Sequence, residues 1–282
     1  MVKTNRGYVF ASAVISAAGV ALTLLSLSTE KWIHGQTRAD ELSPELSDVN
    51  YGLFQGNFKQ FSTVNYQVLM TCSFKHNVCA LLCGKDGDER RTLLDNLYEG
   101  NIDPSYSMSN CPVTTSVYYL PISGSHRTYS GSASSDMKFL NAGVWLCTVI
   151  FIILSISTGL FSAGLALYNT VANPIEFFLS VKSLFIYNGL ACGFIILYLI
   201  LWGAMYNIVI IHNVGLYYTL VGQMSSDKMV YLGYSYWINF GPLVAYTCSV
   251  GLLYYREYLN AKDPKQKNVI LEDSADPNIY LY

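Results

Sequence analysis

Four cysteines in one polar segment are the residues best suited to chemistry in this sequence. Four of the seven cysteines fall within residues 30–138: Cys72, Cys79, Cys83 and Cys111. An even number of thiols in an oxidising compartment favours two disulfides, whereas His76 with Cys79 and Cys83 is the alternative, a metal site. Because Cys79 and Cys83 lie close in sequence, we expect each to pair with Cys72 or Cys111. No metal or other cofactor is therefore expected.

The remaining sequence offers few groups for catalysis. It contains no phosphate-binding loop, metal-ligand pair or serine-nucleophile motif around its four histidines, His34, His76, His126 and His212. The long apolar stretches contain no Asp, Glu, Lys or Arg, the residues that proton relays and ion pathways use inside a membrane. We therefore expect neither an enzyme nor a transporter.

The composition of the chain indicates a membrane protein. Of the 282 residues, 52% are hydrophobic and only 13% are charged, against roughly 25% charged in a typical soluble domain. The 23 tyrosines suit the boundary between lipid and water. A net charge of −2 gives no basic surface, so nucleic acid is not an expected partner.

Four apolar stretches are long enough to cross the lipid layer, which takes about 20 residues. The predicted order is a cytoplasmic N-terminus (1–7), spans at 8–29, 139–168, 184–211 and 234–255, outer segments at 30–138 and 212–233, a cytoplasmic turn at 169–183 and a cytoplasmic tail at 256–282. Lys and Arg gather at both chain ends, which places both termini in the cytoplasm of a plasma-membrane protein. The first stretch could be a signal peptide, but its apolar run exceeds the usual core of about 7–15 residues, which favours an uncleaved helix.

The sequence thus predicts an all-α membrane bundle of four transmembrane helices with a small disulfide-bonded mixed α/β extracellular domain. Within that domain, residues 58–68 and 113–120 have the composition of strands. Residues 88–98 predict a helix with Asp88 as its N-terminal cap.

Small residues in the predicted spans indicate close helix packing. They recur at four-residue spacing as Gly159 with Ala163 and Gly189 with Gly193. Packing within the bundle is the favoured interpretation, and a homo-oligomer or partner interface is the alternative.

The last three residues, Tyr280, Leu281 and Tyr282, form a short motif with a known binding mechanism. Apolar residues at the last and second-before-last positions can extend the sheet of a PDZ domain, whose backbone N–H groups hold the carboxylate. A frayed tail without a partner is the alternative.

Several motifs resemble the clarin family within the claudin/PMP22-like four-transmembrane superfamily. The residues that carry the resemblance are Trp32, Tyr51, Gly52, Leu53, Phe54, Gly56, Tyr168, Asn169, Pro174 and Glu176, followed by the terminal Tyr280-Leu281-Tyr282. A claudin has tryptophan where Phe54 stands, so the clarin pattern is the more similar one. The enlarged first outer segment is typical of a divergent member.

The resemblance implies a non-enzymatic organiser or adaptor in sensory cells, including those of hearing, that connects membrane microdomains to the actin cytoskeleton. Its expected partners are the lipid bilayer, an extracellular or membrane protein and, through the tail, a PDZ scaffold. An auxiliary subunit of an ion channel or receptor is the alternative. A claudin-type cell-contact protein is a further one, which the absence of the second tryptophan disfavours.

Overall fold

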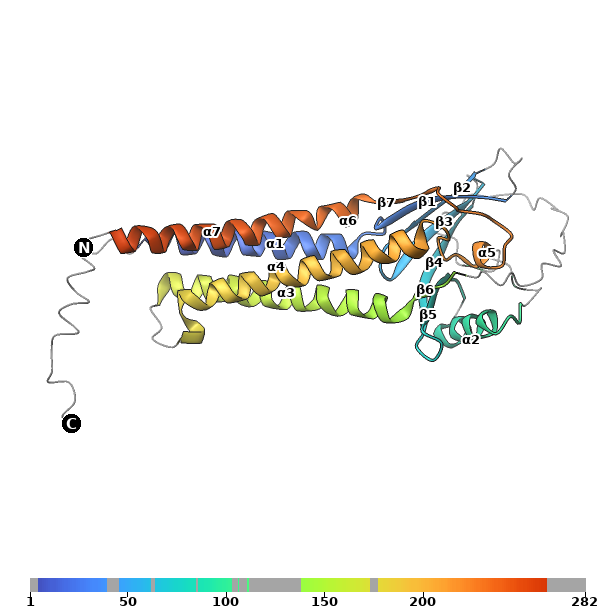
Figure 1. Ribbon diagram of the computed structural model, residues 1–282, viewed down its shortest axis with the longest axis horizontal. Coiled ribbons are helices and arrows are strands. Elements are labelled where there is room, and N and C mark those ends of the chain that lie inside the picture. Colours follow the sequence, from blue (N-terminus) through green and yellow to red (C-terminus); the bar gives the residue numbers. More distant parts are fainter. Residues whose placement is uncertain are drawn as a thin grey trace. The chain divides into compact units, whose positions relative to one another are not determined.

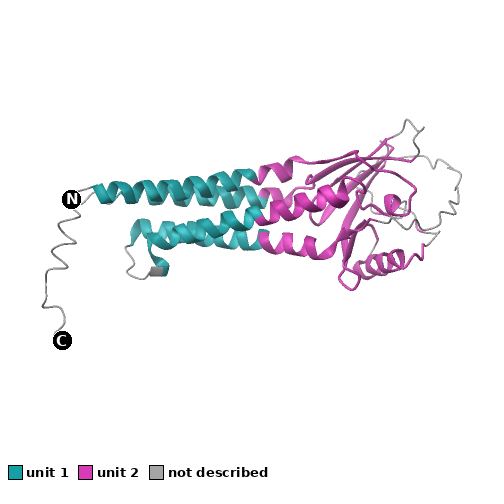
Figure 2. Ribbon diagram, in the orientation of Figure 1, with its two compact units in different colours: residues 1–24, 152–196, 240–282 teal, residues 25–151, 197–239 magenta. Residues whose placement is uncertain are grey.

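The computed structural model describes residues 5–39, 46–61, 64–84, 86–102, 106, 111, 138–172 and 177–262. The chain forms two compact units, coloured separately in Figure 2. Unit 1 comprises Met1–Leu24, Ile152–Ile196 and Phe240–Tyr282, and unit 2 comprises Leu25–Phe151 and Leu197–Asn239. Each unit is therefore assembled from segments that are distant in sequence.

Four long helices, labelled in Figure 1, make up unit 1, and three of them continue into unit 2 (Figure 2). They are α1 (Arg6–Ser28), α3 (Ala142–Val171), α4 (Val181–Met205) and α7 (Phe240–Lys262). A 3-10 turn, η2 (Phe177–Leu179), precedes α4, and a π-helical segment, η3 (Tyr206–Ile210), extends it. Pro242 falls in the first turn of α7, where its missing N–H costs no helical hydrogen bond.

Three of these helices are long and apolar enough to cross a membrane: α1, α3 and the continuous α4–η3 helix. Among the described helices α7 does not meet that criterion. Its tyrosines, together with Arg256 and Glu257, make it less apolar than the others.

The core of unit 1 lies where the four helices meet. It is formed by small and branched apolar side chains, namely Val9, Ala13, Leu165, Ala166, Leu184 and Leu253. Other large apolar side chains of the same helices, such as Val14, Phe161 and Ile186, are exposed. Apolar side chains on the outside of apolar helices are the expected arrangement in lipid.

Unit 2 is built on a seven-stranded antiparallel sheet with the order β6-β5-β4-β3-β2-β1-β7. The strands are β1 (Ile33–Arg38), β2 (Leu46–Tyr51), β3 (Gln55–Gln60), β4 (Val64–Ser73), β5 (Val78–Leu82), β6 (Leu140–Asn141) and β7 (Val230–Leu232). Buried and less buried residues alternate along β1 and β2, as expected for strands with one covered face, while β5 is buried throughout.

Three shorter helices complete unit 2: α2 (Gly87–Tyr98), α5 (Tyr217–Leu220) and α6 (Tyr234–Ile238). The sequence predicts α2 correctly, and Leu94 and Leu97 form its buried face. The predicted cap is wrong, because Asp88 lies inside the first turn. Asp86 occupies the cap position, and its side chain makes no capping hydrogen bond.

The predicted fold class, an all-α bundle of four transmembrane helices, is wrong. The sheet is a large part of the structure, and it recruits residues from beyond the first outer segment. Strand β6 comes from the predicted second span, and β7 comes from the predicted segment 212–233 and pairs with β1 (Ile33↔Leu232). Strands of two or three residues carry no periodic signal of their own, because their pairing partners define them. The predicted strand at 113–120 lies outside the described residues.

Candidate functional site

Trp32 contacts several elements of unit 2. It lies between α1 and β1 and is fully buried. Its Nε1 donates a hydrogen bond to the Ser26 carbonyl (2.8 Å), and its backbone N–H donates to the Tyr51 carbonyl (3.0 Å). Its ring meets Trp202 edge-on, with the ring centroids 5.6 Å apart, and Tyr236 at 6.3 Å. Trp32 thus connects the end of α1 to the sheet through its backbone, and to α4 and α6 through its ring.

The family-like segment 51–56 forms the turn between β2 and β3. Its backbone closes through a hydrogen bond from the Gly52 N–H to the Gln55 carbonyl (2.8 Å). A Cβ on Gly52 would lie 2.6 Å from the Thr29 carbonyl oxygen, and one on Gly56 would overlap Tyr51. Both glycines are therefore required by the close approach of backbone segments.

The middle of this turn is attached to the start of α3. The carbonyl of Leu53, a buried residue, accepts a hydrogen bond from Trp145 Nε1 (2.7 Å). The ring of Phe54 meets the Trp145 ring edge-on at 6.1 Å. The motif that carries the family resemblance therefore connects the sheet to the first and second long helices.

Two tyrosines of the sheet domain are held in their neutral form by burial. The Tyr51 hydroxyl is buried and has no hydrogen-bond partner among the described residues, and burial raises the pKa of Tyr51 well above its ordinary value. The Tyr106 hydroxyl donates to the Cys83 carbonyl (2.9 Å), and burial also raises the pKa of Tyr106.

The four predicted cysteines form two disulfides, Cys72–Cys79 and Cys83–Cys111. The first joins directly opposite positions of β4 and β5, and the second attaches the end of β5 to a residue 28 positions later in the chain. His76 lies against the Tyr98 ring, with the centroids 4.5 Å apart, and its Nε2 is 3.8 Å from the Asp95 carboxylate.

The small residues of the helices divide into two groups. The Tyr246 side chain and Val20 occupy the space that a Cβ on Gly159 would need, and Ala163, one turn later, is buried. Nothing lies within 4 Å of a Cβ on Gly189 or Gly193 among the described residues. Gly159 therefore belongs to a seam inside unit 1. For Gly189 and Gly193 no described atom takes that place, so packing within the bundle gains no support there and an interface for another chain stays the alternative interpretation.

Hydrogen bonds between buried side chains cross the interior of unit 1. Ser12 of α1 bonds to Ser249 of α7 (2.6 Å), and Ser16 of α1 donates to Asn188 of α4 (3.0 Å). Such contacts between small polar residues are a usual source of helix association in lipid. They fix the relative positions of three helices.

Of the remaining predicted residues, Asn169 is buried and its Nδ2 donates to the carbonyls of Leu165 (2.8 Å) and Leu179 (2.6 Å), which ties the end of α3 to η2. Tyr168 is exposed. Other predicted residues lie outside the described part of the chain, namely Pro174, Glu176, Tyr280, Leu281 and Tyr282.

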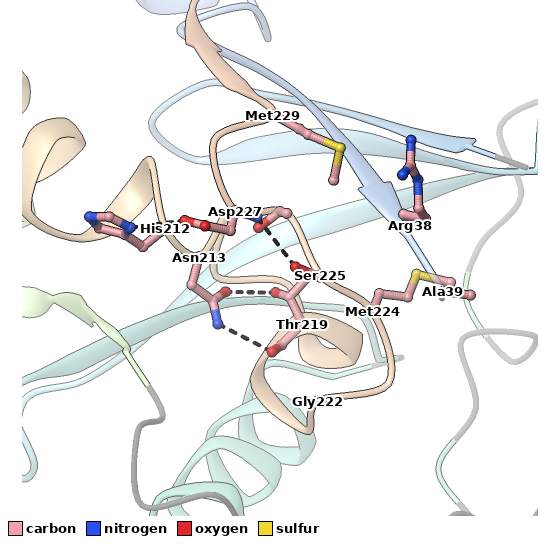
Figure 3. Close-up of a pocket in the computed structure, with 11 residues that line it drawn as sticks. Arg38, Ala39, His212, Asn213, Thr219, Gly222, Met224, Ser225, Asp227 and Met229 are labelled. Carbon is pink, nitrogen blue, oxygen red and sulfur yellow. Dashed lines mark hydrogen bonds and ion pairs between the residues drawn. The ribbon is translucent and has the colours of Figure 1, made fainter. Parts of the chain in front are cut away.

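Unit 2 also contains a polar cavity of about 620 Å³ that the sequence did not predict (Figure 3). It is lined by Arg38, Ala39, His212, Asn213, Thr219, Gly222, Met224, Ser225, Ser226, Asp227 and Met229. The pairing of β1 with β7 brings these residues together from opposite parts of the chain. His212 and Asp227 point toward each other (Figure 3), with Nδ1 2.9 Å from the carboxylate.

No family model matches this chain. A stretch of 57 residues is 37% identical to Clarin-3 of Homo sapiens, which covers 20% of this chain and 25% of Clarin-3. The chain is therefore matched to about a quarter of that relative's length. Together with three helices long and apolar enough to cross a membrane, this local similarity supports a clarin-like membrane protein.

Proposed function

We propose that this protein is a clarin-like organiser of the plasma membrane. Its apolar helices hold it in the bilayer, its sheet domain contacts an extracellular or neighbouring membrane protein, and its C-terminal segment connects to a cytoplasmic scaffold and the actin cytoskeleton, as in sensory cells. The local similarity to Clarin-3 carries this proposal. The attachment of the sheet to the helices through Trp32 and the turn 51–56 supports it, because a rigid support suits a contact domain.

We propose further that the two ends of the chain share the cytoplasmic side. Within unit 1 the start of α1 meets the end of α7, where Asn5 Nδ2 donates to Asn260 Oδ1 (2.9 Å). The Arg6 guanidinium donates to the carbonyls of Thr170 and Val171 (both 3.3 Å), so the end of α3 lies there too. Basic residues at one end of membrane helices favour the cytoplasm.

The protein is proposed to act without catalysis. Three side chains of the sheet domain that could serve as acid, base or nucleophile are engaged in local contacts. Ser73 donates to the Asp95 carboxylate (2.5 Å), and His76 lies between that carboxylate and the Tyr98 ring. These contacts are typical of side chains that stabilise a surface helix.

The scaffold part of the proposal can be tested with the C-terminal segment. A peptide of residues 271–282 with a free carboxylate should bind members of a PDZ-domain array, and the same peptide with one added glycine should not, because the added residue displaces the carboxylate from its backbone donors. Equal binding of the two peptides, or binding of neither, contradicts the scaffold contact.

The organiser role can be tested with the whole protein in sensory cells. Proximity labelling from residue 282 should enrich scaffold and actin-binding proteins over a matched membrane protein that lacks this segment. A labelled set dominated by one pore-forming protein, with currents that change when this chain is removed, would overturn the proposal in favour of an auxiliary channel subunit.

A further inference from the structure

The turn between β4 and β5 exposes a large apolar ring. Phe74 follows the end of β4 and is 59% exposed. Beside it, Lys75 and Glu99 form an exposed ion pair, with Nζ 4.0 Å from the carboxylate. Single exposed apolar side chains are common on proteins, so the position of this ring in the molecule decides what it indicates.

This turn lies beside the first turn of α3 (Figure 1). The Asn77 carbonyl accepts a hydrogen bond from the Ala142 N–H (3.2 Å), and Asn77 Oδ1 accepts one from the Gly143 N–H (2.9 Å). A disulfide joins β4 to β5 at the base of the turn. These bonds hold the turn against the start of α3.

The surface of unit 2 changes from polar to apolar near the start of α3. The exposed residues of β3 include Gln55 and Lys59, whereas Leu146 and Ile150 are exposed apolar residues of α3. Trp145, half-buried, lies in the first turn of α3, and its Nε1 donates to a carbonyl of the turn 51–56. Tryptophan is enriched at the boundary between lipid and water. The change in surface and the tryptophan indicate such a boundary close to the start of α3.

Helix α6 exposes the same kinds of residue. Tyr234 is 51% exposed and Trp237 is 56% exposed. The Lys31 Nζ lies 6.0 Å from the centroid of the Tyr234 ring. Tyrosine, tryptophan and lysine are typical of the layer where lipid headgroups meet water.

Thr29 connects α6 with the turn that holds Trp145. The Thr29 Oγ1 donates to the Ser235 hydroxyl in α6 (2.7 Å), and its carbonyl oxygen lies against the backbone of Gly52. The residue after Gly52, Leu53, accepts the hydrogen bond from Trp145. The exposed rings of α6 and the start of α3 therefore belong to the same junction between the sheet and the helices.

We propose that the lipid–water boundary of the outer leaflet crosses unit 2 at this junction, and that the β4–β5 turn binds the leaflet through the Phe74 ring. The ion pair of Lys75 and Glu99 suits the hydrated headgroup layer, because charged groups are costly deeper in the membrane. The sheet domain then contacts lipid directly, in addition to the helices that continue from it. This inference rests on the proposed position of the helices in the membrane.

The test follows spin labels on the full chain in phosphatidylcholine nanodiscs. One introduced cysteine at a time carries the label, in a background in which the free cysteines are alanine, namely Cys147, Cys192 and Cys248. Power-saturation EPR compares collisions with oxygen, which concentrates in lipid, and collisions with a nickel chelate, which stays in water.

Three labelled positions give the comparison. Phe74→Cys reports on the turn, and Lys59→Cys on the exposed side of β3 is the water control. Ile150→Cys is the lipid control, because Ile150 is exposed and lies about 7.5 Å further along α3 than Trp145. The oxygen-to-nickel ratio at position 74 should lie well above that at position 59 and below that at position 150.

The outcomes separate this inference from the membrane position on which it rests. A ratio at position 74 equal to that at position 59, with a high ratio at position 150, overturns the inference and leaves the helices in the membrane. A water-like ratio at position 150 overturns the proposed membrane position and this inference with it.

Phe74→Trp gives a second measurement that keeps a ring at the turn. Phosphatidylcholine brominated near the headgroup should quench the added fluorescence more strongly than lipid brominated near the ends of its acyl chains. Lys59→Trp is the matched control, whose added fluorescence neither lipid should quench. Equal quenching of the two added rings overturns the inference.

Discussion

In unit 1 the helices approach one another through small side chains, whereas in unit 2 large rings fill the space between the sheet and the helix segments that belong to it. Ser12, Ser249 and Gly159 represent the first arrangement, and Trp32 with Trp202 the second. The two units should therefore respond differently to substitutions that add or remove side-chain volume. Unit 1 should tolerate the loss of a hydroxyl but not added volume, and unit 2 should not tolerate the loss of a ring.

The largest expected loss of stability comes from removing the buried Trp32 ring from unit 2. Trp32→Ala should lower the free energy of unfolding by about 3–5 kcal/mol, because it removes a fully buried ring together with its hydrogen bond to Ser26. Thermal and denaturant unfolding in detergent micelles measure the change. Trp237→Ala is the control, since Trp237 is 56% exposed, and a loss of equal size in both variants would contradict the role given to Trp32.

A larger side chain should destabilise unit 1 at Gly159 but not at Gly189. Gly159→Leu should destabilise the protein by about 1–3 kcal/mol, because the Tyr246 side chain already occupies that space. Gly189→Leu should leave unfolding of the monomer unchanged, because no described atom lies within 4 Å of its Cβ position. The same unfolding assay compares the two variants, and equal effects would show that the seam is misplaced.

Alkaline pH should weaken unit 2 through Tyr51. The unfolded chain releases the phenol proton near the ordinary tyrosine pKa of about 10, while the folded chain retains it because burial raises the pKa of Tyr51. Stability is therefore unaffected below about pH 10 and falls above it, by about 1.4 kcal/mol per pH unit for one such tyrosine.

Tyr51→Phe should remove that part of the alkaline loss and leave stability at neutral pH unchanged or slightly raised, because the hydroxyl has no partner among the described residues. Unfolding measured at about pH 7 and about pH 11, on either side of the ordinary tyrosine pKa, tests both statements, with the exposed Tyr98→Phe as control. A marked loss of stability at neutral pH would indicate that the Tyr51 hydroxyl has a bonded partner.

The smallest effect should follow from removing a hydroxyl in unit 1. Ser249→Ala breaks the bonds to Ser12 (2.6 Å) and Ser16 (3.1 Å), and such contacts in membrane helices contribute on average about 0.6 kcal/mol each. Ser157→Ala, whose hydroxyl is exposed and bonds within its own helix, should change nothing measurable. A loss above that of Gly159→Leu would reverse the order expected for unit 1.

Local patterns in the sequence predicted the parts of the structure that depend on local interactions. The apolar runs located α1, α3 and α4, the charged and apolar pattern of residues 88–98 located α2, and the four cysteines of the polar segment predicted disulfides. The spacing of the cysteines also disfavoured a bond between Cys79 and Cys83, and the structure has none.

What the sequence did not predict depends on contacts between distant residues. Strand β7 exists because Val230–Leu232 pair with β1, nearly two hundred positions earlier. The cavity of unit 2 depends on the same pairing. Its lining residues, Arg38 and Ser226 among them, therefore form no local motif in the sequence. The predicted fourth span, 234–255, overlaps α7 (Phe240–Lys262), which is less apolar than the other three long helices, and its crossing of the membrane stays a prediction.

The central claim, a sheet domain outside the cell with both chain ends inside, is tested most directly by labelling single cysteines on intact cells. In a background with Cys147, Cys192 and Cys248 changed to alanine, Lys59→Cys on the exposed side of β3 and Tyr258→Cys near the end of α7 serve as reporters. A membrane-impermeant maleimide should label Lys59→Cys on intact cells and Tyr258→Cys only after the cells are permeabilised. Labelling of Tyr258→Cys on intact cells, or protection of Lys59→Cys, would contradict the claim.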